Sequence, residues 1–552
     1  MPLSSILYLI VLLPVTLAAT GYFLAQKRYH VLMVLTNLTV SMLAIMLFCV
    51  VRGGGQLEHL MAGWPEGIAI RLVADSLSAP LVMLGALFCT GTLLFSTRAD
   101  YLDKTFIFLF MSLESALLGI FLSADLFNIY VLIELSMLII AILIMYKQDK
   151  QSVYDAMLYL MMNFIAMAFM LLGLGFIYRI TGVLDLDMMQ ERIAMLESPR
   201  AVMLPFAMIM TAIALKAAMF PLFSWLPRAH GAPSAPAIVS AVLSGVQVKT
   251  GVYLLIRVSH VFASQLDASA FFLVLGFITS VIGFMLAICQ KDIKLILAYH
   301  TVSQMGLIVM GLNLGTETAF YGGLYHIINH ALFKGLLFLT AGTIIESYHH
   351  RSYAEIRGVM RTMPAIGIGT LAGMLGITGA PFFNGSISKY FISDGLQGDW
   401  GGMAMFIINL GTTLSFVKYS VVLFGKPATK LSVPRDPWVA CVSLIFGAAC
   451  LLGGLFGGPA VQWLFGPSLR AAGALSLQKL AGFGVTLGIA VLAYLYIVSR
   501  IGTVLTRVRT NRFTFNQLTV MLTIFFMILL AFLWLYGSDA DPVFIDAILP
   551  RP

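Results

Sequence analysis

The chain has 552 residues, of which 60% are apolar and 11% are charged, and its formal net charge is +8. A water-soluble domain carries roughly 45–50% apolar and about 25% charged residues, so this composition excludes a soluble enzyme. At about 20 residues per bilayer crossing, the apolar residues provide for about 16 spans.

Uninterrupted apolar stretches long enough to cross a bilayer recur along the whole chain. We therefore expect an all-α polytopic membrane protein with about 14–16 transmembrane helices. The stretches lie near residues 4–24, 31–51, 77–96, 105–124, 126–146, 153–178, 204–225, 234–258, 270–289, 295–313, 318–346, 363–396, 404–424, 438–458, 476–499 and 516–536.

The basic residues predict the orientation of these spans. Lys27 and Arg28 follow the first stretch and no basic residue precedes it, which is the reverse of a cleavable signal peptide. With the N-terminus outside, the cytoplasmic connections hold 19 Lys and Arg residues and the external connections hold 8. Cytoplasmic loops carry the basic excess in membrane proteins, so both termini are predicted to be external. The positive net charge then reflects orientation, and we expect no nucleic-acid partner.

Nothing in the sequence predicts a cofactor or a metal site. The cysteines stand singly, which excludes an iron–sulfur site or a CxxCH haem attachment. The chain also lacks a P-loop and a GxGxxG after a strand, so we expect no ATP or dinucleotide. An ion gradient or a partner must supply the energy. The cysteines are Cys49, Cys89, Cys289, Cys441 and Cys450.

Ten charged residues fall inside the predicted spans. A charged side chain at a helix centre costs about 2.5–3.5 kcal/mol on insertion scales, so such residues must face a protein interior or water and are the functional candidates. The basic residues are Lys216, Lys249, Arg257, Lys334, Lys389 and Lys418, and the acidic ones are Glu114, Glu134, Asp155 and Glu346.

Glu134 and Lys216 lie in the middle of different spans and form a candidate ion pair. Burial lowers the pKa of a lysine and a nearby carboxylate raises it again, so a moving partner loads and unloads one proton. A static salt bridge that fixes helix packing is the competing interpretation.

His326, His330 and Lys334 are spaced at i, i+4 and i+8, which places them along one face of the eleventh span. Imidazole accepts a proton on one nitrogen and releases one from the other near neutral pH, so this stripe suits a proton relay. Ligation of a metal or haem by the two histidines, or simple core packing, are the alternatives.

Two spans are predicted to be interrupted. Lys216 precedes Pro221 and Pro227, and a Gly- and Pro-rich run precedes Lys389. Freed backbone at membrane depth needs a protein-lined or hydrated cavity, and paired breaks indicate an inverted-repeat transporter. The expected units are helices 1–3 in residues 1–100, a first five-helix repeat in 101–261, a second, inverted repeat in 268–426, and helices 14–16 in 427–552.

The remaining candidates carry weaker signals. Lys249 lies between the two breaks in sequence and is a candidate bridge, and Lys418 is a candidate exit. Arg257 is expected to extend to an interface. Glu114 and Asp155 are interpreted as packing or entrance groups, and His300 as a helix cap.

Several long motifs resemble the antiporter-like membrane subunits shared by Mrp-type cation/proton antiporters, respiratory complex I and membrane-bound hydrogenases. Within this family the motifs most resemble the D-type member of the Mrp antiporters. The resemblance covers roughly residues 75–425. The motifs are SADLFNIYVLIELSML, LKAAMFPLFSWLPRAHGAPSAPAIVSAVLSGVQVKTGVYLLIR, LAYHTVSQMGLIVMG, YHIINHALFKGLLFLTAGTI and GAPFFNGSISKYFI.

The resemblance implies a fourteen-helix core with two inverted five-helix repeats and discontinuous helices 7 and 12. It implies that Glu134 and Lys216 form the glutamate–lysine pair and that Lys249 connects the halves. His326, His330 and Lys334 would form the relay, and Lys389 its terminal lysine. The two spans after about residue 460 exceed that core and are interpreted as a subunit contact or anchor.

The leading hypothesis is a proton-translocating subunit of a multi-subunit Na⁺/proton antiporter in the inner membrane of a prokaryote. Its expected partners are other hydrophobic membrane subunits, protons, a monovalent cation and the lipid bilayer. The first alternative is a proton-pumping subunit of a redox-driven complex, such as complex I or a membrane-bound hydrogenase. The second is a non-conducting scaffold subunit.

Overall fold

The computed structural model describes residues 3–52, 54–65, 67–231, 235–396, 399–427, 436–498 and 514–537. Its elements up to residue 262 are α1 (Ser5–Gly21), α2 (Gln26–Val51), β1 (Leu57–Leu60), η1 (Met61–Gly63), β2 (Arg71–Ala74), α3 (Ser78–Phe95), α4 (Lys104–Leu122), α5 (Leu126–Ile144), α6 (Lys150–Thr181), α7 (Leu186–Ala194), α8 (Arg200–Lys216), η2 (Leu222–Ser224), α9 (Trp225–Gly231), α10 (Ala237–Val242), η3 (Leu243–Gln247) and α11 (Val248–Phe262).

The named elements in the second part of the chain are all helices. Its elements are α12 (Ser269–Cys289), α13 (Ile293–Leu312), α14 (Glu317–Tyr348), α15 (Val359–Thr362), α16 (Pro364–Thr378), α17 (Asn384–Gly395), α18 (Asp399–Ser420), α19 (Pro437–Leu455), α20 (Gly457–Phe465), η4 (Ala472–Leu475), α21 (Leu477–Ala493), η5 (Tyr494–Val498) and α23 (Phe515–Tyr536).

The predicted all-α polytopic architecture is confirmed. Within the described residues, 13 helices are long and apolar enough to cross a membrane. All 16 predicted stretches fall on helices, and those below full length are α1, the short α8 and the split pair α16 and α17. The division into two five-helix repeats stays a prediction.

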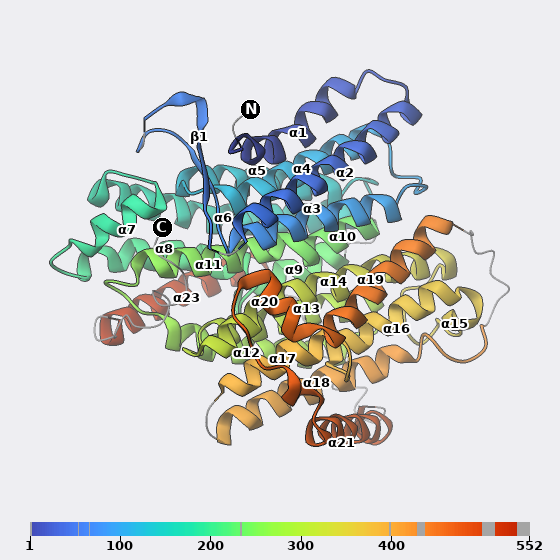
Figure 1. The fold of residues 1–552 in the computed structure, drawn as a ribbon. Helices are drawn as coiled ribbons and strands as arrows, with labels where there is room; N and C mark the ends of the chain where they lie inside the picture. Colours follow the sequence, from blue (N-terminus) through green and yellow to red (C-terminus); the bar gives the residue numbers. More distant parts are fainter. Residues whose placement is uncertain are drawn as a thin grey trace.

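The helices pack into one bundle around α14. This helix contacts α3, α10, α13, α16, α17 and α19, so its side chains are buried over most of its length. Most long helices run side by side across Figure 1, with the β1–β2 hairpin and α7 at one end of the bundle and α15 at the opposite end. We call these the hairpin face and the α15 face.

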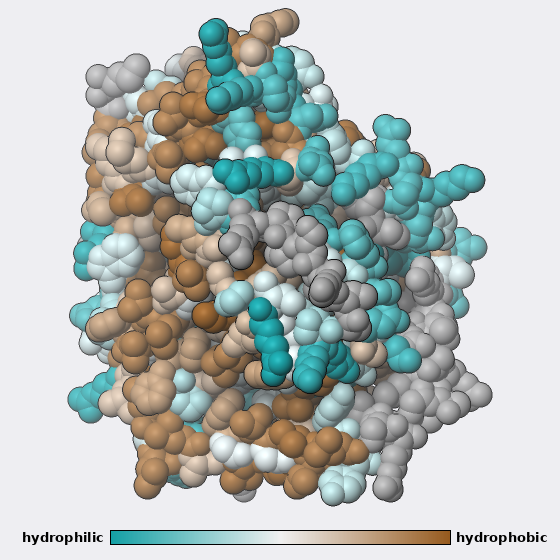
Figure 2. Space-filling model, turned by 90° about the vertical axis from the view of Figure 1, so that its right-hand side faces the viewer, coloured by the Kyte–Doolittle hydropathy of each residue, from teal (hydrophilic) through white to brown (hydrophobic). Residues whose placement is uncertain are grey.

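Hydrophilic side chains gather at one end of the bundle (Figure 2), and large apolar side chains are exposed on its helices. Figure 2 shows the α15 face, where hydrophilic side chains gather over the upper and right-hand parts and apolar side chains follow the left and lower edges. Many large apolar side chains on the helices are exposed, including Val131 and Leu135 on α5 and Leu172 on α6. A bilayer provides the solvent for such side chains.

The first predicted break is present between α8 and α9. Helix α8 ends at Lys216, and the chain passes through the short turn η2 before α9 begins at Trp225. Proline has no backbone N–H to continue the ladder, which is why the helix cannot run through Pro221. The Trp225 indole donates a hydrogen bond of 2.8 Å to the Leu215 carbonyl and so satisfies one carbonyl that the helix end leaves free.

The second predicted break separates α16 from α17. Helix α16 ends at Thr378, and Gly379 has φ 75°, a left-handed conformation that glycine adopts without a Cβ clash. Helix α17 starts at Asn384 and carries Lys389 in its middle. Each break therefore places a lysine beside a helix end at the depth of the bundle core.

The two C-terminal helices pack on different parts of the bundle. Helix α21 contacts α18, whereas α23 contacts α6 and α8 beside the first break. One face of α23 is buried there through Leu522, Phe525 and Leu529. The basic residues Lys430, Arg435, Arg500, Arg507, Arg509, Arg512 and Arg551, which contribute to the predicted orientation, lie outside the described residues.

Candidate functional site

Lys216 stands at the open C-terminal end of α8 and is only 4% exposed. Its Nζ has no hydrogen-bond partner within the described part of the chain. Glu134 on α5 is half-buried and interacts electrostatically with Lys216, and Tyr130 lies beside it one turn earlier. Among the described residues no direct ion pair joins Glu134 to Lys216, so the predicted pair is coupled through space.

Lys249 on α11 contacts the histidine stripe on α14. Its Nζ lies 2.6 Å from His330 Nδ1 on α14, and it also donates to the Ser244 carbonyl. Ser244 belongs to η3, a π-helical turn directly before α11. Such turns occur frequently at functional sites, and this one offers its carbonyl to the lysine. In the sequence Lys249 lies between the two breaks, and in the structure its side chain lies against α14.

A close approach of backbones places Lys249 near Lys216. A Cβ built on Gly251 of α11 would meet Ala217 N at 2.5 Å and the Lys216 carbonyl carbon at 2.7 Å. Only glycine leaves room for this contact. Helix α11 therefore passes directly against the end of α8, two residues beyond Lys249.

His326 connects α14 to α17 and to α13. Its Nδ1 lies 2.8 Å from Ser388 Oγ on α17, and its Nε2 lies 3.0 Å from Gln304 Oε1 on α13. The ring centroids of His326 and His330 are 6.5 Å apart. Because Ser388 directly precedes Lys389, the histidine stripe reaches the second break.

The other candidate lysines Lys334, Lys389 and Lys418 also bind backbone carbonyls, two of them at helix ends. Lys389 donates to the Ile377 carbonyl at 2.8 Å, in the last turn of α16. Lys418 donates to the Ile288 carbonyl at 2.6 Å, in the last turn of α12. Helix C-termini carry unpaired carbonyls and partial negative charge, so both are natural lysine sites. Lys334 instead donates to the Leu297 carbonyl at 2.6 Å, inside α13.

The secondary acidic candidates lie apart from this axis. Glu114 on α4 is 1% exposed, and neither carboxylate oxygen has a hydrogen-bond partner among the described residues. Asp155 on α6 accepts a bond of 3.0 Å from Gln151 and lines a cavity beside the first break. Asp155 therefore lies at a cavity wall, whereas Glu114 lies in the packing between helices.

One prediction for a weaker candidate is wrong. His300 does not cap a helix end: it lies inside α13, is fully buried, and packs against Phe416 at a centroid distance of 4.9 Å. Arg257 reaches toward the hairpin face, where its Nη2 forms an ion pair of 2.6 Å with the partly exposed Asp75. The carboxylate of Asp75, which directly follows β2, fixes the position of the guanidinium. The sequence pattern does not predict this pair, because the two residues are distant in the chain.

A cavity of about 960 Å³ opens beside the first break. Its wall includes Phe220, Pro221 and Ser224 from the broken segment, Asp155 from α6 and Arg228 from α9. It also includes residues of the 351–355 loop, so the cavity lies toward the α15 face. The prediction that a break at membrane depth adjoins a cavity agrees with this geometry.

Sequence reasoning missed three side chains that contact the axis. Gln304 and Ser388 bind His326, and His230 stacks on Phe338 at 4.3 Å beside Lys334. Gln304 and Ser388 are uncharged, and His230 stands alone in its segment, so no spacing marked them. Their position in the quoted motifs was the only signal available.

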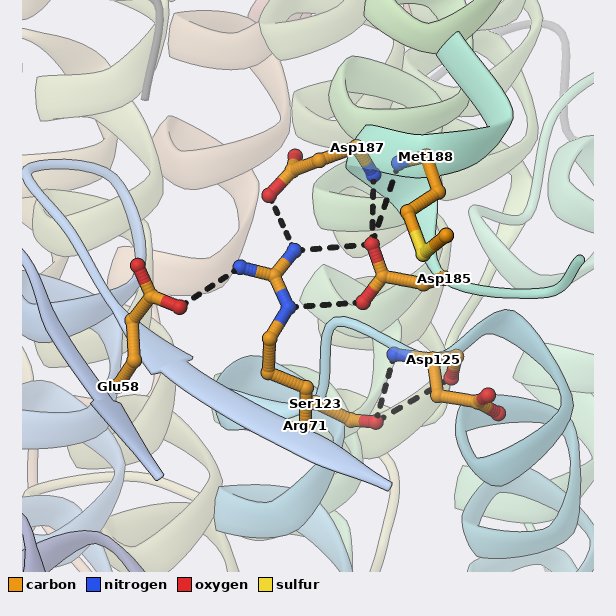
Figure 3. A network of polar contacts seen from close by, with 7 residues as sticks. All are labelled: Glu58, Arg71, Ser123, Asp125, Asp185, Asp187 and Met188. Carbon is orange, nitrogen blue, oxygen red and sulfur yellow. Dashed lines mark hydrogen bonds and ion pairs between the residues drawn. The ribbon is translucent and has the colours of Figure 1, made fainter. Parts of the chain in front are cut away.

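A second polar network lies on the hairpin face, and it was not predicted (Figure 3). Arg71 on β2 holds Asp185 through two bonds of 2.8 and 3.0 Å and also contacts Asp187 and Glu58. Asp185 in turn caps α7 by accepting from the Asp187 and Met188 amides. Burial alone would lower the pKa of Arg71, but the bonds to Asp185 and Asp187 raise it. The network fixes the hairpin to α7.

The fold and the site together define a class: a polytopic α-helical membrane protein with two broken helices and a buried lysine–histidine axis. A family model described as "NADH:quinone oxidoreductase/Mrp antiporter, TM" matches residues 123–417. The chain is 32% identical to NADH-quinone oxidoreductase subunit N of Desulforudis audaxviator (strain MP104C) over 64% of its own length and 72% of the relative. It therefore belongs to the NADH:quinone oxidoreductase/Mrp antiporter transmembrane family.

Two further likenesses fall on the Mrp side of this family. The chain is 28% identical to a protein named as an antiporter subunit, mnhD2, of Staphylococcus aureus (strain MRSA252), over 74% of its length and 83% of the relative. Its fold matches a chain of the Mrp complex from Dietzia sp. DQ12-45-1b with a TM-score of 0.77 at 24% identity. That match covers 88% of this chain and 100% of the other.

Proposed function

We propose that this chain is a proton-translocating subunit of a multi-subunit Na⁺/proton antiporter in a prokaryotic inner membrane. The single observation that carries the proposal is the 2.6 Å contact between Lys249 Nζ and His330 Nδ1. It joins a buried lysine of one broken-helix half to the histidine stripe of the other. The Ser244 carbonyl can only accept from Lys249, whereas the imidazole of His330 is a partner that also accepts and releases a proton.

Proton uptake is assigned to the cavity beside the first break. Phe220, four residues after Lys216, lies in the cavity wall. Asp155 and Arg228 contribute polar side chains to the same wall. Lys216 has no hydrogen-bond partner among the described residues, so its charge depends on Glu134. A change in the distance between these two side chains therefore controls whether Lys216 holds or releases a proton.

The onward path runs through neighbouring buried side chains. From Lys216 the proton passes to Lys249, whose helix packs directly against the end of α8 at Gly251, and then to His330, which Lys249 contacts. His326 and Ser388 extend the path to Lys389, with Lys334 one turn beyond His330 on α14. Each imidazole takes a proton on one nitrogen and gives one from the other.

The partners and orientation of this subunit follow from the likenesses and the charge pattern. The Mrp complex that its fold matches is an assembly of subunits, so we propose hydrophobic membrane subunits as partners. The basic excess of 19 to 8 supports both termini outside. The hairpin face is then external and the α15 face cytoplasmic.

Replacement of Lys216 tests the proposal directly. We expect Lys216→Ala to abolish Na⁺-driven proton movement in vesicles that contain the assembled complex, with assembly unchanged. Lys27→Ala, at an exposed lysine outside the bundle core, is the matched control and should transport normally. Wild-type transport by an assembled Lys216→Ala complex contradicts the proposal. Replacing Na⁺ by K⁺ or choline in the same assay identifies the cation.

A redox-driven complex is the second candidate, and one observation favours it. The relative with 32% identity is a quinone oxidoreductase subunit, whereas the antiporter relative shares 28%. Purification of the native complex separates the two: iron–sulfur or nickel subunits identify the redox complex, and small hydrophobic subunits alone identify the antiporter.

A scaffold role is the third candidate, in which the buried charges only hold helices together. Lys389→Met keeps the side-chain volume and removes the charge that binds the end of α16. Full transport by this variant supports the scaffold, because replacing a buried charge with an apolar side chain is often tolerated structurally. Loss of transport in an intact complex supports conduction.

A further inference from the structure

Helix α11 carries a polar stripe that the path above does not use. Tyr253, Arg257 and His260 follow Lys249 at i+4, i+8 and i+11, which is one face of a helix. Tyr253 is 1% exposed and His260 is 9% exposed. The stripe runs from Lys249 to the hairpin face, away from the cavity at the first break.

Two side chains of the stripe, Tyr253 and Arg257, are joined to one another and to the turn before α3. The Tyr253 hydroxyl donates to the Phe121 carbonyl at 2.9 Å and accepts from Arg257 Nε at 3.0 Å. Arg257 Nη2 pairs with Asp75 Oδ2 at 2.6 Å. The other oxygen of Asp75 accepts from the Leu77 and Ser78 amides at 3.0 and 2.8 Å, so the carboxylate is held in place.

A cavity of about 160 Å³ lies over this pair on the hairpin face. Its polar lining includes Asp75, Ser76, Asp187, Tyr253, Arg257 and His260. A water occupies about 30 Å³ and needs two to four polar partners, so this cavity has room and partners for several waters. Tyr253 is the innermost of these groups along α11, and four residues of helix, about 6 Å, separate it from Lys249.

We propose that Tyr253 and the Asp75–Arg257 pair form a gated proton passage between Lys249 and the hairpin face. This inference rests on the proposed function of the lysine–histidine axis. With the pair intact, Arg257 occupies the acceptor position of the Tyr253 hydroxyl and places a positive charge in the passage. Both effects oppose a proton, as an arginine does in other proton-excluding pores.

Opening requires Arg257 to leave Tyr253. The Tyr253 hydroxyl also turns from the Phe121 carbonyl toward the cavity. A proton from Lys249 then binds the Tyr253 oxygen through a water, while the proton already on that hydroxyl passes to a cavity water. One proton enters and one leaves, so tyrosine is neutral before and after the step. The passage gives the axis a second opening, at the end of the bundle opposite the cavity beside the first break.

Tyr253→Phe is the decisive variant, because it removes only the hydroxyl. We expect proton flux through the assembled complex in proteoliposomes to fall at least tenfold. Tyr29→Phe is the matched control, since Tyr29 is also fully buried and also donates to a backbone carbonyl, that of Ala18 at 3.1 Å. It should leave flux unchanged while costing similar thermal stability. Equal flux in the two variants overturns the passage.

Chemical closure of the cavity gives an independent measurement. Ser76→Cys lines the cavity, and Ser198→Cys lies exposed in the connection between α7 and α8. A charged, membrane-impermeant thiol reagent applied from the hairpin face should block flux in the first variant and spare the second, with the parent chain reporting on native thiols. Modification of Ser76→Cys without loss of flux contradicts the passage. Normal flux in Lys216→Ala contradicts the axis itself, so the two failures are distinct.

Discussion

Lys249 Nζ lies 2.6 Å from His330 Nδ1, although the two residues are 81 positions apart in the chain. Both side chains are buried, and His330 Nε2 has no partner among the described residues. An ammonium donates only, so with Lys249 charged the Nδ1 nitrogen must accept and the imidazole proton resides on Nε2. Transfer of one Lys249 proton to Nδ1 reverses the roles, because the imidazolium Nδ1–H then donates to the neutral amine, and this makes the contact the natural switch point of the axis.

The switch predicts that charge alone is not enough at position 249. Lys249→Arg keeps a positive charge and hydrogen-bond donors, but a guanidinium does not release its proton in a protein. We expect the variant to assemble and to lose proton flux at least tenfold in proteoliposomes. Lys27→Arg, at an exposed site, is the control. Retained flux in Lys249→Arg would show that the residue acts as a fixed charge.

The contact at Gly251 predicts a steric effect. A Cβ there would lie 2.5 Å from Ala217 N, so Gly251→Ala must push α11 away from the end of α8. Overpacking of this kind costs about 1–3 kcal/mol. We expect a lower unfolding temperature and reduced flux. Gly175→Ala on α6 is the control, because nothing lies within 4 Å of its Cβ position, and it should unfold no earlier than the parent.

The hairpin-face network predicts a stability effect without an effect on the axis. Arg71→Gln leaves Asp185, whose side chain is 8% exposed, without its cation. Removing one partner of a buried pair costs about 3–5 kcal/mol, and the exposure of the other two acidic partners, Glu58 and Asp187, favours the lower end. Thermal unfolding of the purified complex measures this loss. Arg179→Gln, at an exposed arginine, should unfold like the parent.

The Asp75–Arg257 pair predicts a pH dependence of stability. Burial would raise the pKa of Asp75, but the Arg257 charge and the Ser78 bonds outweigh it and lower the pKa below the ordinary value of 3.8. A depressed carboxyl pKa contributes stability that is present above the unfolded-state value and lost as the pH falls through the folded-state value. Unfolding temperatures should therefore decline below about pH 4 less steeply in Asp75→Asn than in the parent. Parallel curves would contradict this assignment.

Composition and local spacing were enough to establish the class of this protein and most of its candidate residues. Apolar stretches of about 20 residues must become helices in a bilayer, because no other structure satisfies the backbone there. Proline after Lys216 and the glycine- and proline-rich run before Lys389 predicted the two breaks, because both residue types interrupt a helix locally. The i, i+4, i+8 spacing placed His326, His330 and Lys334 on one face without knowledge of any neighbour.

Which buried groups touch one another could be learned only from the packed helices. The Lys249–His330 contact, the close approach at Gly251 and the Arg257–Asp75 pair all join helices or turns distant in sequence. Helical spacing fixes a side chain's direction on its own helix but carries no information on the partner across the interface. That is why the sequence misplaced His300 and did not predict the partner of Arg257, whereas the stripe on α14 needed only the local helical repeat.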